Sequence, residues 1–271
     1  MSRNPPRKGH FRIVSWNINS VRARLESIEK FLKDYDPDVL CLQEIKATED
    51  VFPLQFFEDL GFKHTAIRGQ KSYHGVATLA RCPLSKIQSR DWCGKGDARH
   101  VSVRLPMGSL LHIFYVPAGG DIPDPKTNDK FEHKLAFLNE MITWSKKLHQ
   151  PSILVGDLNV APTEWDVWSH KALLNVVSHT PVETSLMLEL QQAHNWVDAV
   201  RHMKPEPEKL YSWWSYRARD WAESNRGRRL DHIWVSPELG ASIQNVEIAT
   251  RVRGWEKPSD HAPVILDIKL S

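Results

Sequence analysis

The stretch Pro151-Ser-Ile-Leu-Val-Gly-Asp-Leu-Asn159 places a short apolar run directly before two polar side chains. The apolar run predicts a buried strand over 152–155. Asp157 and Asn159 are one residue apart, so in extended backbone they project to the same side, and Gly156 lets another backbone or a ligand come close. Together a carboxylate and a carboxamide can accept a hard cation and donate a hydrogen bond to an oxyanion. The simpler explanation, that both residues only form a turn or a cap, stays open.

Polar side chains stand in a similar position at four other predicted strands. They are Asn17 and Asn19 at the end of 11–18, Glu44 after 38–43, Asp231 at the start of 231–235, and Asp260 with His261 before 263–268. Each alone fits a turn former, a helix cap or, for His261, a satisfied core histidine. All of them together favour a functional site.

The remaining pattern predicts a mixed α/β fold. Strands are expected at 62–67, 75–80, 101–105 and 110–116, as one β-meander, and at 211–214; helices are expected at 20–36, 54–60 and 130–148, with helical and loop segments over 183–200. So many strands with helices in both halves predict two packed mixed β-sheets flanked by helices. Because no linker or repeat interrupts the chain, we expect a disordered lead-in over 1–10 and one catalytic domain over 11–271.

Composition narrows the class of protein. The 271 residues are 41% hydrophobic and 25% charged, with a mean hydropathy of −0.44, which excludes a disordered chain and a multi-span membrane protein. A net charge of +3 is too small by itself to indicate a nucleic-acid partner. Cys41, Cys82 and Cys93 form no CxxC pair, which argues against a disulfide framework or structural zinc. Without a signal-peptide pattern, we expect a cytoplasmic protein with no membrane partner.

The motifs that are missing limit the chemistry. The chain has no HExxH zinc motif, no GxxxxGK[ST] nucleotide loop and no GxSxG serine elbow. Oxygen donors with few histidines suit Mg²⁺, with Mn²⁺ as a substitute. Such ions usually act on phosphates, so metal-assisted phosphodiester hydrolysis is the leading reaction class.

An arginine-rich and aromatic stretch predicts contact with DNA. It contains Arg217, Arg219, Arg226, Arg228 and Arg229 together with Trp213, Trp214, Tyr216 and Trp221. Arginines among aromatic rings suit phosphate contact and insertion into a disturbed base step. A solvated surface loop with core tryptophans is the alternative. Lys71, Ser72 and Tyr73 form a second candidate contact loop.

Six motifs follow one another along the chain. They are Val14-Ser-Trp-Asn-Ile-Asn19, Cys41-Leu-Gln-Glu-Ile-Lys46, His74-Gly-Val-Ala-Thr-Leu79, Gly156-Asp-Leu-Asn-Val-Ala-Pro-Thr163, Asn225-Arg-Gly-Arg-Arg-Leu-Asp231 and Lys257-Pro-Ser-Asp-His-Ala-Pro263. This ordered set resembles bacterial exonuclease III, the Mg²⁺-dependent apurinic/apyrimidinic endonuclease family. The resemblance implies a DNase I-like four-layer sandwich and a monomer in base excision repair. It would hydrolyse the phosphodiester 5′ to abasic sites and remove nucleotides or blocking groups from 3′ ends of duplex DNA.

The resemblance also implies a metal shell. Its residues would be Glu44 as the main ligand, with Asn17, Asp157, Asn159 and Asp260 in or next to the shell. Asp157 would deprotonate or orient the attacking water, and Asn159 would hold that water or the developing oxyanion.

The same resemblance implies how the phosphate is held. His261, oriented by Asp231, would contact the scissile phosphate and stabilise its charge, and Tyr115 would supply a phenolic donor or a proton. Trp213 and Leu230 would line a pocket that admits a flipped abasic sugar and excludes an intact base. The DNA itself would contact Lys71, Tyr73, Trp213, Arg217, Arg226, Arg228, Leu230 and His261.

Two positions depart from the family pattern. Ser20 replaces a frequent glycine, and Arg228 stands where relatives carry an apolar or aromatic pocket wall. A long, mobile Arg228 is expected to make substrate selection less strict.

Two other functions stay open. An inositol-phosphate phosphatase or a sphingomyelinase would share the acidic set, although the arginine and tryptophan stretch favours DNA. A non-catalytic DNA-binding module would need a replaced catalytic position, and none is replaced.

Overall fold

Side chains alternate along the buried strands between different apolar environments. In β1 (His10–Asn17), Ile13 packs in a core that both sheets share, whereas Trp16 faces a second core on the other side. In β8 (Ser152–Asp157), Val155 faces the shared core and Leu154 faces a third. Strands that are buried on both faces are continuous apolar runs, and this is why both segments lie inside a layered structure.

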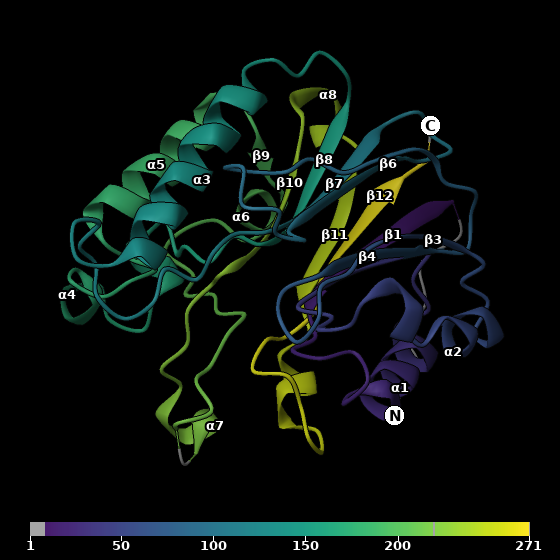
Figure 1. The fold of residues 1–271 in the computed structure, drawn as a ribbon, viewed down its shortest axis with the longest axis horizontal. Helices are drawn as coiled ribbons and strands as arrows, with labels where there is room; N and C mark the ends of the chain where they lie inside the picture. Colours follow the sequence, from purple (N-terminus) through teal and green to yellow (C-terminus); the bar gives the residue numbers. More distant parts are fainter. Residues whose placement is uncertain (1–8, 219, 271) are drawn as a thin grey trace.

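The computed structural model describes residues 9–218 and 220–270, with two six-stranded sheets (Figure 1). The first sheet has the order β11 (Ile243–Ile248), β12 (Val264–Lys269), β1, β2 (Val39–Gln43), β4 (Val76–Ala80), β3 (His64–Arg68). The second has the order β5 (Ser85–Gln88), β6 (His100–Arg104), β7 (Leu110–Tyr115), β8, β10 (Asp231–Val235), β9 (Val197–Asp198).

Helices cover the outer face of each sheet. On the first sheet, α1 (Leu25–Tyr35) and α2 (Leu54–Asp59) bury Phe31 and Phe57 in the second core. On the second sheet, α3 (Asp129–Ser145) and α5 (Pro181–Gln192) bury Phe137 and Met187 in the third core. The predicted sandwich of two mixed sheets flanked by helices is therefore confirmed. No helix in the described ranges is long and apolar enough to cross a bilayer.

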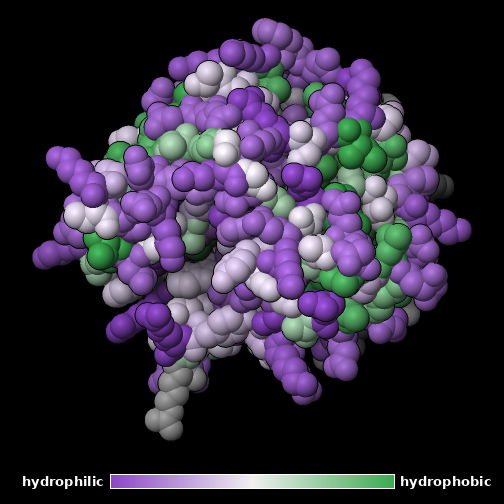
Figure 2. All heavy atoms as spheres, viewed as in Figure 1, coloured by the Kyte–Doolittle hydropathy of each residue, from purple (hydrophilic) through white to green (hydrophobic). Residues whose placement is uncertain are grey.

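Short helices occupy the loops around this sandwich. They are α4 (His170–Leu173), α6 (Ala199–Met203), α7 (Trp221–Ser224) and α8 (Pro237–Gly240), with 3₁₀ turns at Glu49–Val51, Glu164–Asp166 and Thr250–Gly254. Figure 1 shows α7 at the end of an arm that projects from the body of the molecule. Figure 2 shows that the face seen from this side is covered mostly by hydrophilic side chains.

Several predicted elements differ from the structure. The single meander is wrong, because β3 and β4 pair in one sheet while β6 and β7 pair in the other. No strand forms at 211–214, where Trp213 makes only isolated bridges to Arg228 and His261. The strands β5, β9 and β11 were not predicted. Of the lead-in expected over 1–10, residues 1–8 lie outside the described residues, and His10 already belongs to β1.

Two parallel pairs of strands create the polar edge of the molecule. β1 runs parallel to β2, and β7 runs parallel to β8. The carboxyl ends of parallel strands meet at one edge of a sheet, so Asn17 lies beside Gln43 and Tyr115 lies beside Asp157. The antiparallel strand β10 adds Asp231 opposite Asp157.

Candidate active site

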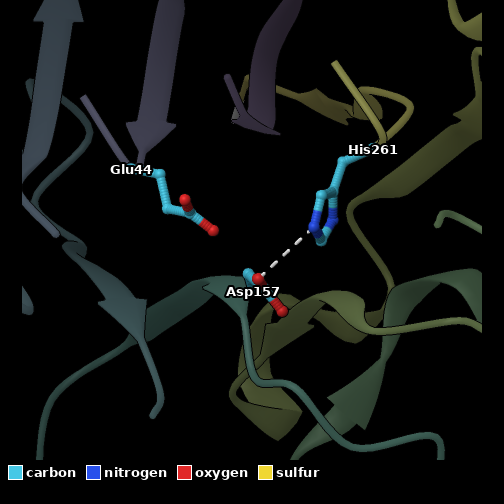
Figure 3. Close-up of side chains that lie close together, drawn as sticks. All are labelled: Glu44, Asp157 and His261. Carbon is cyan, nitrogen blue, oxygen red and sulfur yellow. Dashed lines mark ion pairs between the residues drawn. The ribbon is translucent and has the colours of Figure 1, made fainter. Parts of the chain in front are cut away.

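Three ionisable side chains from distant parts of the sequence converge at this edge. Glu44 follows β2, Asp157 ends β8, and His261 lies in the loop before β12. One possible ligand atom from each lies within 4.8 Å of the other two. Figure 3 shows the three side chains pointing toward one another.

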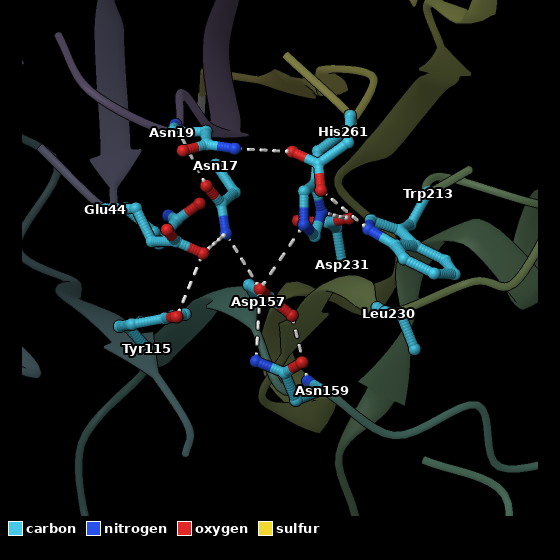
Figure 4. Close-up of polar contacts among 12 residues, drawn as sticks. Asn17, Asn19, Glu44, Tyr115, Asp157, Asn159, Trp213, Leu230, Asp231 and His261 are labelled. Carbon is cyan, nitrogen blue, oxygen red and sulfur yellow. Dashed lines mark hydrogen bonds and ion pairs between the residues drawn. The ribbon is translucent and has the colours of Figure 1, made fainter. Parts of the chain in front are cut away.

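Asn17 connects the two acidic residues of this cluster. Its Nδ2 donates to Glu44 Oε1 and to Asp157 Oδ2, both at 2.9 Å, and its side chain is buried (Figure 4). Tyr115 Oη donates to the same Glu44 oxygen at 2.9 Å. Burial raises the pKa of Tyr115 well above its usual range, and the charges of Glu44 and Asp157 add to this effect. The phenol therefore keeps its proton and acts as a donor.

The imidazole of His261 lies between two carboxylates. Nδ1 is 2.8 Å from Asp231 Oδ2, and Nε2 is 3.7 Å from Asp157 Oδ2. Burial alone would lower the pKa of His261, but the charges of Asp231 and Asp157 outweigh it and raise the pKa to about 10. The Oδ2 atom of Asp231 also accepts from Ser212 Oγ at 2.7 Å, which fixes the carboxylate that orients the ring.

The cluster carries more acid than base. Burial raises the pKa of Asp157 to about 7, His261 opposes that rise, and Asp231 adds to it. Glu44 pairs with Lys46 Nζ at 2.9 Å. Burial raises the Glu44 pKa, but the hydrogen bond from Asn17 and the charge of Lys46 outweigh it and leave it lowered. Convergent carboxylate oxygens with excess negative charge fit a hard divalent cation.

The backbone conformation that places Asn159 at the site differs from the one that the sequence predicted. The extended path expected through Asn159 is wrong, because Asn159 adopts a left-handed backbone (φ 54°), which asparagine tolerates. Its Nδ2 donates to Asp157 Oδ2 at 3.2 Å and to Val116 O at 2.9 Å. Gly156 permits a close approach as expected, since a Cβ there would lie 1.9 Å from Phe114 O.

Asp260 lies beside the cluster and is held by two neutral donors. Asn19 Nδ2 donates to Oδ1 and Trp213 Nε1 donates to Oδ2, both at 3.0 Å. Asp260 is not among the three residues whose ligand atoms lie within 4.8 Å of one another. In this geometry Asp260 fixes the edge of the indole beside His261.

A pocket of about 670 Å³ adjoins the site at Trp213. Its lining includes Trp213, Arg217, Arg226 and Arg228. Leu230, which was expected to line the sugar pocket with Trp213, does not line this one. It is buried with Val167 and Leu173 in a small apolar cluster, against which Trp213 packs.

The arginines of the expected DNA stretch have different environments. Arg228 is anchored rather than mobile: its Nη1 donates to Val177 O at 3.0 Å and Ser178 Oγ at 2.8 Å. Arg229, a member of the arginine-rich stretch that predicted DNA contact, is buried and paired with Asp166 and Asp198. Arg219 lies outside the described residues. The number of arginines in a stretch does not indicate which side chains are buried. Only the local backbone conformation decides whether Arg228 or Arg229 points into the protein.

The second candidate contact loop lies apart from that pocket. Lys71 and Ser72 line a different pocket of about 360 Å³ together with Arg22 and Lys46. Tyr73 is 66% exposed, and its ring lies 6.0 Å from the ring of His74. The ring of His74 in turn lies 5.9 Å from that of Tyr115, so the loop borders the site through one intervening side chain.

Three supporting residues were missed at the level of the sequence. Lys46 pairs with Glu44, Ser212 holds Asp231, and Arg99 lies over the Tyr115 ring at 5.0 Å. Lys46 stands in the same six-residue motif as Glu44, which was a usable signal. Ser212 and Arg99 carry no local pattern, because their partners are distant in the chain.

Comparisons with known proteins agree with this geometry. Residues 14–261 match the model of the Endonuclease/Exonuclease/phosphatase family. The chain is 31% identical to "Exodeoxyribonuclease III" of Haemophilus influenzae, over 95% of this chain and 100% of the relative. An AP endonuclease from Archaeoglobus fulgidus superposes with a TM-score of 0.88 at 29% identity, over 94% of this chain and 98% of the other.

A third comparison involves a structure with DNA. The 3′ phosphatase NExo from Neisseria, bound to a product DNA hairpin, superposes with a TM-score of 0.86 at 28% identity, over 95% of this chain and 99% of the other. Family match, sequence identity and fold thus agree over nearly the whole length of the chain. This chain belongs to the Endonuclease/Exonuclease/phosphatase family, and within it to the exodeoxyribonuclease III proteins.

Proposed function

We propose that this protein is a DNA repair nuclease of the exonuclease III type. It hydrolyses the phosphodiester 5′ to abasic sites and removes nucleotides or blocking groups from the 3′ ends of duplex DNA. The observation that carries the proposal is the convergence of one ligand atom each from Glu44, Asp157 and His261 within 4.8 Å, at the edge of the sandwich where β2 and β8 end. Relatives named as an exodeoxyribonuclease, an AP endonuclease and a 3′ phosphatase support the same range of substrates.

Mg²⁺ is the proposed cofactor, with Mn²⁺ as a substitute. Glu44 and Asp157 would hold the ion, Asn17 would keep their carboxylates in place, and Asn159 and Asp260 would border the shell. When bound, the ion would neutralise charge on the phosphate and polarise it. A set of oxygen donors without a thiolate favours these hard ions over zinc.

The residues of the chain supply the remaining chemistry. Asp157 accepts a proton from the attacking water or orients it, and Asn159 holds that water or the developing oxyanion. The water oxygen bonds to phosphorus, the bond from phosphorus to the 3′ oxygen breaks, and the leaving 3′ oxygen takes a proton. His261, fixed by Asp231, stabilises the charge that develops on the phosphate, and Tyr115 donates a hydrogen bond or that proton.

DNA would lie across the edge that carries this cluster. Arg217, Arg226 and Arg228 would contact it from one side, Lys71 and Tyr73 from the other, and Trp213 would limit the space beside the scissile phosphate. We propose further that the protein works as a monomer, as one catalytic domain over 11–271, in the cytoplasm.

A duplex with one abasic site tests the proposal. With Mg²⁺ we expect a single nick 5′ to the site, and with EDTA no nick, because the acidic cluster then lacks its cation. Glu44→Gln should bind the duplex but nick it at least 100-fold more slowly, within the range of single catalytic groups. Binding without any nicking by the wild type would favour the non-catalytic module, and full activity after exhaustive chelation would contradict the metal mechanism.

A further inference from the structure

A buried lysine contacts the loop that carries Asn159. Lys134, on α3, is completely buried, although ionised side chains seldom are. Its Nζ donates to Asn159 O at 2.7 Å and to Ala118 O at 3.3 Å, and it pairs with Glu183 Oε1. An ammonium has three N–H donors, so these three partners use all of them. None of the chemistry proposed for the active site uses this charge.

The carboxylate that pairs with Lys134 belongs to the start of another helix. Glu183 is the third residue of α5, where it forms a capping box with Thr180. The carboxylate accepts from the backbone N–H groups of Ser178 at 2.9 Å and Thr180 at 3.1 Å, and from Thr180 Oγ1 at 2.7 Å. Glu183 is therefore fixed by α5 itself, and Lys134 connects this fixed carboxylate to the loop of Asn159.

The two carbonyls that Lys134 binds lie in the loops that follow β7 and β8. Asn159 has a left-handed backbone (φ 54°), and its Nδ2 donates to Asp157 Oδ2 at 3.2 Å (Figure 4). Ala118 precedes Gly119, where a Cβ would lie 2.9 Å from Lys134 Cδ, so the glycine lets the loop after β7 pack on the methylene chain of the lysine. Lys134 thus joins both loops at the residue where the backbone of Asn159 turns.

The alternative is that Lys134 and Glu183 form an ion pair that only joins α3 to α5. The two bonds from Lys134 to loop carbonyls argue against this reading, because an ion pair between helices does not require them. A left-handed residue other than glycine persists only where its surroundings fix it. A charged donor makes a stronger hydrogen bond than a neutral one, which suits it to fix Asn159 O.

We propose that Lys134 is a positioning residue for the hydrolysis, which holds Asn159 in the left-handed conformation that directs its carboxamide to Asp157. This inference rests on the proposed function, because it assumes that Asn159 holds the attacking water or the developing oxyanion. Lys134 is buried and acts through Asn159 O, without contacting the DNA. Loss of this bond lets the carboxamide leave its productive position, so the chemical step slows while DNA binding is unchanged.

A paired substitution tests this role. Lys134→Met/Glu183→Gln removes both charges together, so that no unpaired charge stays buried. On a duplex with one abasic site, we expect kcat to fall roughly tenfold, which is less than the ~100-fold cost of a misplacement by ~1 Å. KM should stay within about twofold of the wild-type value, because the bond acts on the chemical step and not on binding.

Asp267→Asn is the matched control for lost stability. Asp267 on β12 pairs with Arg12 Nε at 2.6 Å, and this buried pair lies near the opposite end of β1 from Asn17. The variant should unfold at a lower temperature than the wild type, but its kcat should stay within about twofold. An equal fall in kcat would show that lost stability alone explains the effect at Lys134.

A double-mutant cycle tests whether Lys134 acts through Asn159. In an Asn159→Ala background, the roughly tenfold effect of Lys134→Met/Glu183→Gln should shrink to about twofold or less, because the carboxamide that it positions is already absent. Single-turnover rates of the four proteins measure the coupling. The same loss in both backgrounds would show independent effects and would overturn the role.

A measurement on the wild type tests the role even where the paired variant does not fold. Because its three protons are bonded and shielded from water, Lys134 Nζ should give a slowly exchanging ¹⁵N–¹H signal at neutral pH in NMR spectra. Absence of that signal, a wild-type kcat in the folded paired variant, or a raised KM with unchanged kcat would each overturn the role of Lys134. Absence of any nick by the wild type with Mg²⁺ would instead overturn the proposed function, and this inference with it.

Discussion

Two buried charge clusters in this molecule differ in their balance. Around Arg229, two arginines meet two carboxylates: Asp166 bonds Arg229 and Arg201, both at 2.6 Å, and Asp198 completes the set. At the active site, Glu44, Asp157 and Asp231 outnumber His261 and Lys46. In a balanced cluster every charge has a partner within the protein, and the cluster supports the fold. In an unbalanced cluster the excess carboxylates are neutralised by a bound ligand or cation.

The largest expected effect is at the unbalanced cluster. Asp157→Asn keeps the volume of the side chain but removes the proton acceptor, so turnover on an abasic duplex should fall by two orders of magnitude or more. Stability should not fall, because the change relieves repulsion among buried acids. Single-turnover cleavage and thermal unfolding of the same sample measure both. A variant that turns over nearly normally would place the base elsewhere, with Tyr115 or His261 next.

The balanced cluster should respond in the opposite way. Asp166→Asn removes the carboxylate that bonds both Arg229 and Arg201, and leaves Arg229 buried with Asp198 alone. The free energy of unfolding should fall by about 3 kcal/mol, as when one partner of a buried pair is lost. Chemical denaturation measures this loss. Equal stability of Asp166→Asn and wild type would show that the network is not structural, and the contrast with Asp157 would fail.

A fall in pH should reduce the stabilisation that Asp166 gives to the balanced cluster. Burial raises the Asp166 pKa, but Arg229 and Arg201 outweigh it and lower the pKa to about 2. The pKa of an aspartate in an unfolded chain is about 3.9. Because the folded pKa is the lower one, this stabilisation is fully present above pH ~4 and is lost as the pH falls toward 2. The difference in unfolding free energy between wild type and Asp166→Asn should therefore shrink between pH 5 and pH 2, and a constant difference would contradict the assignment.

The sequence predicted strand ends better than it predicted side-chain partners. Apolar runs located β1, β2 and β8, and the polar residues that follow them do meet at one edge. These signals are local, since they arise from burial of each strand on its own two faces. The pairing of His261 with Asp231 joins two distant segments, so the resemblance of the motifs, and not spacing, suggested it. The ion pair of His261 with Asp157 was not predicted.

Irregular backbone conformations near the site could not be predicted from the sequence. Trp213 lies in a segment that resembled a strand, yet it makes only isolated bridges, because Arg228 and His261 approach it from two sides. The left-handed conformations of Asn159 and Glu44 likewise depend on neighbours far along the chain. Leu230 lies in a buried cluster and does not line the pocket that Trp213 lines, which residue type alone cannot reveal.

The smallest expected effect concerns Trp213, which lines the pocket of about 670 Å³ and donates to Asp260. Trp213→Ala should lower nicking at an abasic site severalfold and raise the relative rate on normal 3′ ends, because truncation enlarges the space in which an intact nucleotide would clash. Trp213→Phe is the matched control, since it keeps the wall but loses the bond to Asp260 at 3.0 Å. The ratio of the two activities should change in Trp213→Ala and stay close to wild type in Trp213→Phe. If Trp213→Ala lowers both activities in proportion, or only lowers the melting temperature, Trp213 is structural and does not select the substrate.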